Sequence, residues 1–74
     1  MNQQPPPPEL SADLFAEALR RTQAEFREMP GLKLTEAQIA RLLSFDSALC
    51  SAVISTLVDQ RFLMRTRNTF QRAS

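Results

Sequence analysis

Apolar side chains recur at helical spacing in the first half of the chain. Six residues fall on one face of a helix drawn over residues 12–29: Phe15, Ala18, Leu19, Thr22, Phe26 and Met29. Charged residues occupy the opposite side, and Glu17 and Arg21 stand four apart in the favourable order for an ion pair. Pro30 and Gly31 then form a turn signal. The pattern predicts an amphipathic first helix over residues 12–29.

Two further helices are predicted in the middle of the chain. Thr35 is a suitable N-cap for a short helix over residues 36–43. After a turn at SFD, either Asp46 or Ser47 caps a third helix that runs to about residue 60. The spacing of its apolar residues predicts a buried stripe that consists of Cys50, Val53, Ile54, Leu57 and Val58.

Short strands are predicted on both sides of this helix pair. The stretch GLKL, residues 31–34, alternates apolar and polar side chains, which is typical of a strand. Residues 63–66 and 69–72 read as a hairpin, because Arg67 and Asn68 can form a tight turn in which Asn68 adopts a positive φ. The predicted order is therefore helix, strand, helix, helix, strand, strand.

The segment QIARLLSFDSALCSAVISTL, residues 38–57, has the spacing of a helix-turn-helix. Ala40 provides the small side chain that lets two helices cross closely, and Ile39 and Leu43 flank it on the buried side. Ser44 occupies the turn, and Phe45 follows as an apolar plug. Two positions of the next helix, Cys50 and Val53, are expected to be buried.

With the flanking strand and hairpin, this arrangement resembles the winged helix-turn-helix family of DNA-binding domains over residues 11–72. The resemblance implies a mainly α fold, a small winged helix-turn-helix with three helices, a short strand and a C-terminal β-hairpin. Ser44 and Arg61 stand where the family often has glycine, so a positive φ is expected at both residues. Cys50 is interpreted as a small core residue.

The length of 74 residues allows one domain. The stretch NQQPPPP near the start favours polyproline II, so residues 1–10 are predicted to be a disordered leader and residues 11–74 the winged domain. A core this small, without a disulfide, is expected to be supported by a second copy or another protein. The sequence contains neither an apolar run of membrane-spanning length nor a signal peptide, which predicts a cytoplasmic protein without membrane contact.

Candidate chemistry is sparse. Cys50 is the only cysteine and histidine is absent, so the sequence offers no disulfide and no zinc site. Gly31 is the only glycine, which excludes a phosphate-binding glycine loop. No catalytic group of residues is recognisable. We therefore expect no enzyme activity, no cofactor, no metal and no small-molecule substrate.

Charge is distributed unevenly along the chain. Residues 1–60 hold all eight acids and five basic residues, whereas residues 61–74 hold four arginines and no acid. The family resemblance implies that the third helix enters the major groove of DNA while the hairpin, or wing, contacts the backbone or the minor groove. The wing and its base contain four arginines that can neutralise phosphates. They are Arg61, Arg65, Arg67 and Arg72. Another interpretation of these arginines is a solvated edge that discourages pairing between sheets.

The outer face of the third helix offers small hydroxyls at Ser47, Ser51 and Ser55, which bind phosphate or base edges weakly. The leading prediction is a module for double-stranded DNA with little sequence specificity, in a transcription-regulatory or accessory role. The alternative is a protein-interaction or oligomerisation module on the same scaffold. Its contact surface would be either part of the apolar face of the first helix or a small apolar patch on the third helix, which comprises Ala48, Leu49 and Ala52.

Overall fold

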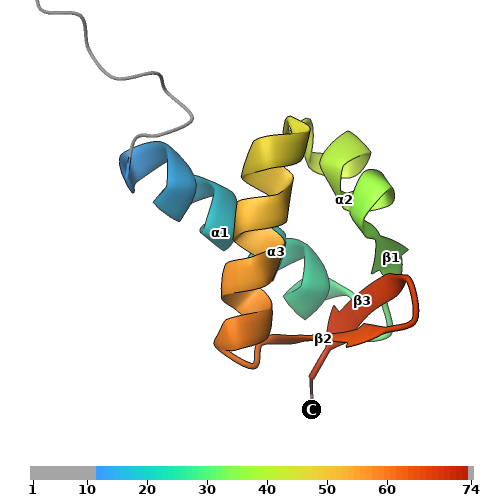
Figure 1. Cartoon of the computed structure of the whole chain (residues 1–74). Helices are drawn as coiled ribbons and strands as arrows, with labels where there is room; N and C mark the ends of the chain where they lie inside the picture. The colour runs from blue at the N-terminus through green and yellow to red at the C-terminus, as the bar shows by residue number, and fades with distance from the viewer. Residues whose placement is uncertain (1–11, 74) are drawn as a thin grey trace, which may run out of the picture.

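The structure, a computed structural model, describes residues 12–73; the predicted leader lies outside these residues. It contains three helices and a small antiparallel sheet (Figure 1). The elements are α1 (Ala12–Glu28), β1 (Leu34–Thr35), α2 (Glu36–Leu43), α3 (Ser47–Asp59), β2 (Leu63–Thr66) and β3 (Thr69–Arg72). This mainly α, winged-helix-like layout confirms the fold class predicted from the sequence.

The apolar face of α1 is buried at its centre and open at its C-terminal end. Ala18, Thr22 and Phe26 are buried, and the hydroxyl of Thr22 donates a hydrogen bond to the carbonyl oxygen of Ala18 at 2.8 Å. The prediction that Met29 belongs to the buried face is wrong, because the helix ends at Glu28 and the Met29 side chain is 52% exposed.

The ion pair on the surface of α1 also differs from the prediction. Glu17 pairs with Arg20 rather than with Arg21. Arg21 instead donates a hydrogen bond to the carbonyl oxygen of Leu43 at 3.3 Å, and its guanidinium lies 5.6 Å from the centre of the Phe45 ring. Arg21 therefore ties α1 to the end of α2.

Helix α2 begins and ends on defined caps. Thr35 and Gln38 form a capping box, in which the Thr35 hydroxyl accepts a hydrogen bond from the Gln38 amide and the Gln38 side chain accepts one from the Thr35 amide. At the other end, Ser44 is left-handed with φ 59°, as expected. The amides of Ser44 and Phe45 both donate to the carbonyl oxygen of Ala40.

Helix α3 starts after a sharp change of direction. The Asp46 carboxylate accepts a hydrogen bond from the Leu49 amide at 2.8 Å and so caps the helix. The chain bends by 114° between α2 and α3 across residues 44–46, within the range of helix-turn-helix motifs. No single helix within residues 12–73 is long and apolar enough to cross a membrane; α2 and α3 reach the necessary apolar length only as this bent pair.

The sheet has the order β1-β3-β2, with both pairings antiparallel. Leu34 pairs with Phe70 and Thr35 pairs with Thr69, so β1 spans two residues. The predicted strand over residues 31–34 is therefore displaced. Residues 31–33 belong to the turn after α1, where the Leu32 amide donates to the carbonyl oxygen of Met29 at 2.9 Å.

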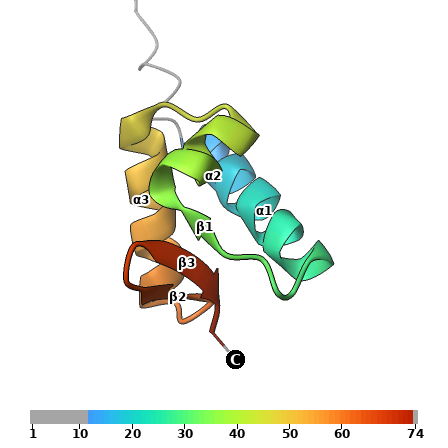
Figure 2. The same cartoon turned by 90° about the vertical axis from the view of Figure 1, so that its right-hand side faces the viewer.

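The core forms where α3 packs against α1, α2 and β2, and the hairpin lies at the C-terminal end of α3 (Figures 1 and 2). The burial expected from the helix-turn-helix spacing is confirmed for Ile39, Leu43, Phe45, Cys50 and Val53. Ile54, Leu57, Leu63 and Phe70 complete this part of the core. Val58 of the predicted stripe is partly buried against it.

Candidate nucleic-acid interface

Over residues 47–55, the outer face of α3 carries small, uncharged side chains. Ser47, Ser51 and Ser55 are exposed there, as are Ala48 and Ala52. The face is fixed because the opposite side of the helix is held in the core and its first turn is capped. It offers hydroxyl and methyl groups but no side chain that can make a bidentate contact to a base.

A groove of about 250 Å³ separates this face from the hairpin. Ser51 and Ser55 from α3 and Arg65 from β2 line it, so the structure brings these three predicted site residues together. Two carboxylates, those of Glu36 and Asp59, line the same groove. The groove therefore combines one guanidinium with two acidic groups, and its walls do not form a uniformly positive surface.

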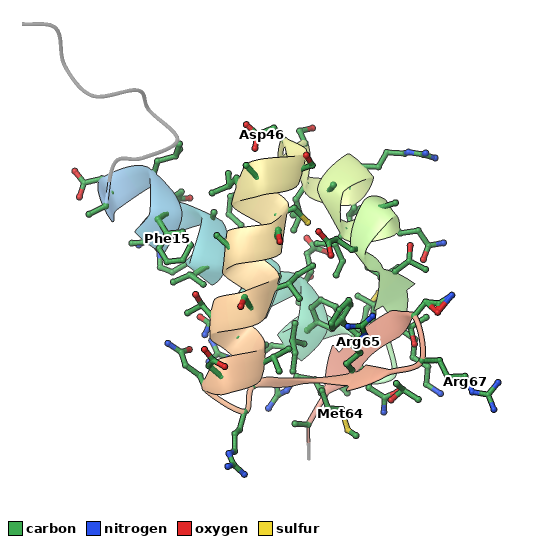
Figure 3. All side chains as sticks on the ribbon, in the orientation of Figure 1. Phe15, Asp46, Met64, Arg65 and Arg67 are labelled. Carbon is green, nitrogen blue, oxygen red and sulfur yellow. The ribbon has the colours of Figure 1, made fainter. Side chains whose placement is uncertain are left out.

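Arg65 is held over this groove by contacts within the hairpin. Its Nε atom donates a hydrogen bond to the carbonyl oxygen of Arg67 at 3.1 Å, and its guanidinium lies 5.9 Å from the centre of the Phe70 ring. Arg65 and its neighbour Met64 point to opposite sides of the hairpin (Figure 3). The Arg65 charge is thus directed toward the α3 side of the hairpin.

Arg67 projects from the tip of the hairpin, away from the body (Figure 3). The side chain is exposed and the backbone is left-handed, with φ 60°. The prediction of a positive φ at Asn68 is wrong, because the residue of this turn with a positive φ is Arg67. A positive φ at the first central residue suits a two-residue hairpin turn, because it matches the twist of the flanking strands.

The other two arginines lie at the base of the hairpin. Arg61 is exposed in the connection between α3 and β2, and its φ of 63° confirms the expected left-handed backbone. Arg72, the last residue of β3, is half-buried with its guanidinium 4.3 Å from the centre of the Phe62 ring. The four arginines therefore do not form one surface, and Arg65 and Arg67 are the pair nearest the hairpin tip.

The three residues of the alternative protein-contact patch do not lie equally open. Ala48 and Ala52 are exposed, whereas Leu49 is half-buried and packs against the core. Leu49 lines a second hollow of about 330 Å³, between α1 and the helix-turn-helix turn, together with Ala18 and Phe45. The exposed part of the patch therefore consists of two methyl groups.

Cys50 is fully buried in the core. Burial, with a smaller contribution from the Glu36 carboxylate, raises the pKa of the thiol to about 11. Its sulfur donates a weak hydrogen bond to the carbonyl oxygen of Glu36 at 3.6 Å. The thiol is thus protonated at neutral pH, which agrees with its interpretation as a core residue. Within residues 12–73, no group of three or more His, Cys, Asp or Glu side chains is arranged to hold a metal ion.

Two features of the site were not predicted from the sequence. Glu36 was read only as a residue of the second helix, although the crossing of α2 and α3 brings it to the groove. Phe62 was not assigned a role, although the guanidiniums of Arg27 and Arg72 both lie over its ring. The neighbouring arginines were visible in the sequence, but nothing in their spacing predicts convergence on one ring.

No family model, curated protein or solved structure matches this chain. The assignment of a function therefore rests on its own residues.

Proposed function

We propose that this protein binds double-stranded DNA through the phosphate backbone, with Arg65 and Arg67 as the main contacts. The observation that carries the proposal is the exposed position of these two side chains, with Arg65 on the α3 side of the hairpin and Arg67 at its tip (Figure 3). Neither pairs with a carboxylate; the ion pair formed within residues 12–73 joins Glu17 to Arg20. An unneutralised charge next to a helix with small side chains favours close approach of a polyanion.

This arrangement supports binding with little discrimination between sequences. The α3 face supplies Ser47, Ser51 and Ser55, whose hydroxyls bind phosphate but read bases poorly. Glu36 and Asp59 line the groove and repel phosphate there. The duplex would therefore contact the N-terminal half of α3 and the hairpin tip. The corresponding role is regulatory or accessory in transcription, without enzyme activity.

Fluorescence anisotropy with a random duplex at two salt concentrations tests the proposal. Wild type is expected to bind less tightly as salt rises, because the phosphates it neutralises release counterions. Changing Arg65 and Arg67 together to alanine is expected to reduce the slope of log K against log salt by about 2, roughly 0.9 per lost phosphate contact. A wild-type protein without salt-dependent binding would rule out this function.

A protein-interaction module is the second candidate, and one observation favours it. The groove beside α3 presents the carboxylates of Glu36 and Asp59 together with the uncharged side chains of Ser51 and Ser55, which suits a basic protein segment better than a phosphate. Ala52→Arg separates the two functions. It adds a positive charge to the α3 face, so it should strengthen duplex binding if α3 faces DNA and weaken any self-association or protein contact made there.

The exposed Ala24 on α1 offers a matched control, because Ala24→Arg adds the same charge to a different exposed helix position. Equal effects of the two variants on duplex binding would show a general response to net charge. A stronger effect of Ala52→Arg would assign the contact to the α3 face.

A further inference from the structure

The aromatic ring of Phe62, at the base of the hairpin, lies between parts of the chain that are far apart in sequence. The guanidinium of Arg27, from the last turn of α1, lies 5.3 Å from the centre of this ring, and that of Arg72, from the end of β3, lies 4.3 Å from it. Both distances are within the range of cation–π contacts. One ring therefore connects the end of α1 to the end of the wing.

The backbone fixes the position of the ring. The Phe62 amide donates to the carbonyl oxygen of Leu57 at 2.9 Å, and the Ala73 amide donates to the carbonyl oxygen of Phe62 at 3.1 Å. The left-handed Arg61 comes immediately before it. The ring is thus anchored to the last turns of α3, and the two arginines hold α1 and β3 to that anchor.

Arg72 differs from the arginines near the hairpin tip in its surroundings. It is half-buried, and its Nε atom is buried without a hydrogen-bond partner among the described residues. Its strand partner is the buried Leu63, at the far end of the hairpin from Arg67. Three strand steps of about 3.3 Å separate Arg72 from Thr69, the first residue of β3, so the Cα atoms of these two residues lie about 10 Å apart.

We infer that Arg72 is a positioning residue, which orients the wing through Phe62 and Arg27 and does not itself contact phosphate. This inference rests on the proposed function for its effect on binding. Its structural part is independent of any ligand: the guanidiniums of Arg27 and Arg72 hold the Phe62 ring between them, an arrangement called the clamp below. Loss of one cation–π contact of ordinary strength lowers the ratio of the oriented to the displaced wing by about 2- to 5-fold.

Amide hydrogen exchange in the free protein tests the clamp. Arg72→Ala and Phe62→Leu are each expected to raise exchange rates in β2 and β3 by about 2- to 5-fold relative to α2. Phe62→Tyr keeps an aromatic ring and should retain protection. Arg61→Ala is the matched control, because it removes a positive charge from the hairpin base without removing a guanidinium from the ring.

Duplex binding at two salt concentrations tests the role in function. Arg72→Ala and Phe62→Leu should weaken binding by the same factor at both concentrations and leave the salt slope unchanged, whereas Arg65→Ala should lower the slope by about 0.9. A slope lowered by Arg72→Ala without faster exchange would identify a direct phosphate contact and overturn the inference. Unchanged exchange and binding would also overturn it. If wild type binds no duplex, the proposed function fails, and the exchange rates alone decide whether the clamp exists.

Discussion

Arg21, in the middle of α1, donates a hydrogen bond to the carbonyl oxygen of Leu43, the last residue of α2. The same guanidinium lies over the ring of Phe45, in the turn between α2 and α3. One side chain thus satisfies a helix-terminal carbonyl and covers the apolar plug of the helix-turn-helix. This contact fixes where α1 crosses the motif.

Removing this contact should cost stability. Arg21→Ala is expected to lower the free energy of unfolding by about 1 kcal/mol, because it removes a hydrogen bond and a cation–π contact. Arg20→Ala is the control, since the exposed Arg20–Glu17 pair contributes little. Urea unfolding of both variants measures the difference. Equal losses would show that the Arg21 contact contributes no more than a surface ion pair.

The left-handed backbone at Ser44 predicts a stabilising substitution. Ser44→Gly should raise the free energy of unfolding by about 0.5 to 1 kcal/mol, because glycine has no Cβ atom that would clash at a φ of 59°. Ser44→Ala keeps the Cβ atom and should not stabilise the protein. Thermal unfolding of the two variants makes the comparison, and a gain shared by both would rule out backbone strain as the cause.

Close packing of α2 on α3 can be tested at Ala40, which is half-buried against the core. Ala40→Leu is expected to destabilise the protein by about 1 to 3 kcal/mol through overpacking. Ala37→Leu, on the exposed side of the same helix, adds the same atoms where space is available. The prediction fails if denaturant unfolding shows that both variants are equally stable.

The buried thiol predicts a loss of stability at alkaline pH. Because the pKa of Cys50 is about 11 in the folded protein, against an ordinary value of 9.0, folding favours the protonated thiol. Stability from this group is fully present below about pH 9 and declines as the pH rises toward 11. Tyrosine is absent from the chain, so no phenol group titrates in this window. Cys50→Ala should flatten the decline in unfolding free energy, and a parallel decline in the variant would assign it to another group.

Much of the secondary structure was determined by local sequence. The bounds of α2, β2 and β3 were predicted to the residue, and α1 and α3 to within one residue at their ends. Local signals account for this success. The side chains of Thr35 and Asp46 supply the oxygens that cap α2 and α3. The apolar stripe of a helix recurs with a recognisable period in the sequence. These interactions span three or four residues, so they can be read from the chain alone.

The candidate site was predicted in part for the same reason. Ser51 and Ser55 follow from helical period, and Arg65 follows from the hairpin, so the sequence placed these residues on the surfaces where they are found. The expectation that Arg72 would join the same basic surface depended on its direction at the end of a strand. The structure turns its guanidinium onto Phe62 instead.

Tertiary packing decided the features that join distant residues. Strand β1 lies at Leu34–Thr35 because those two residues meet β3, and the alternation in the sequence alone could not choose that register. Arg21 does not pair with Glu17, four residues before it in α1. It donates a hydrogen bond to the carbonyl oxygen of Leu43, 22 residues away, because the fold places the end of α2 beside α1. Helix period and caps are encoded within a few residues, whereas the partner of a long side chain depends on which surfaces the completed fold brings within its reach.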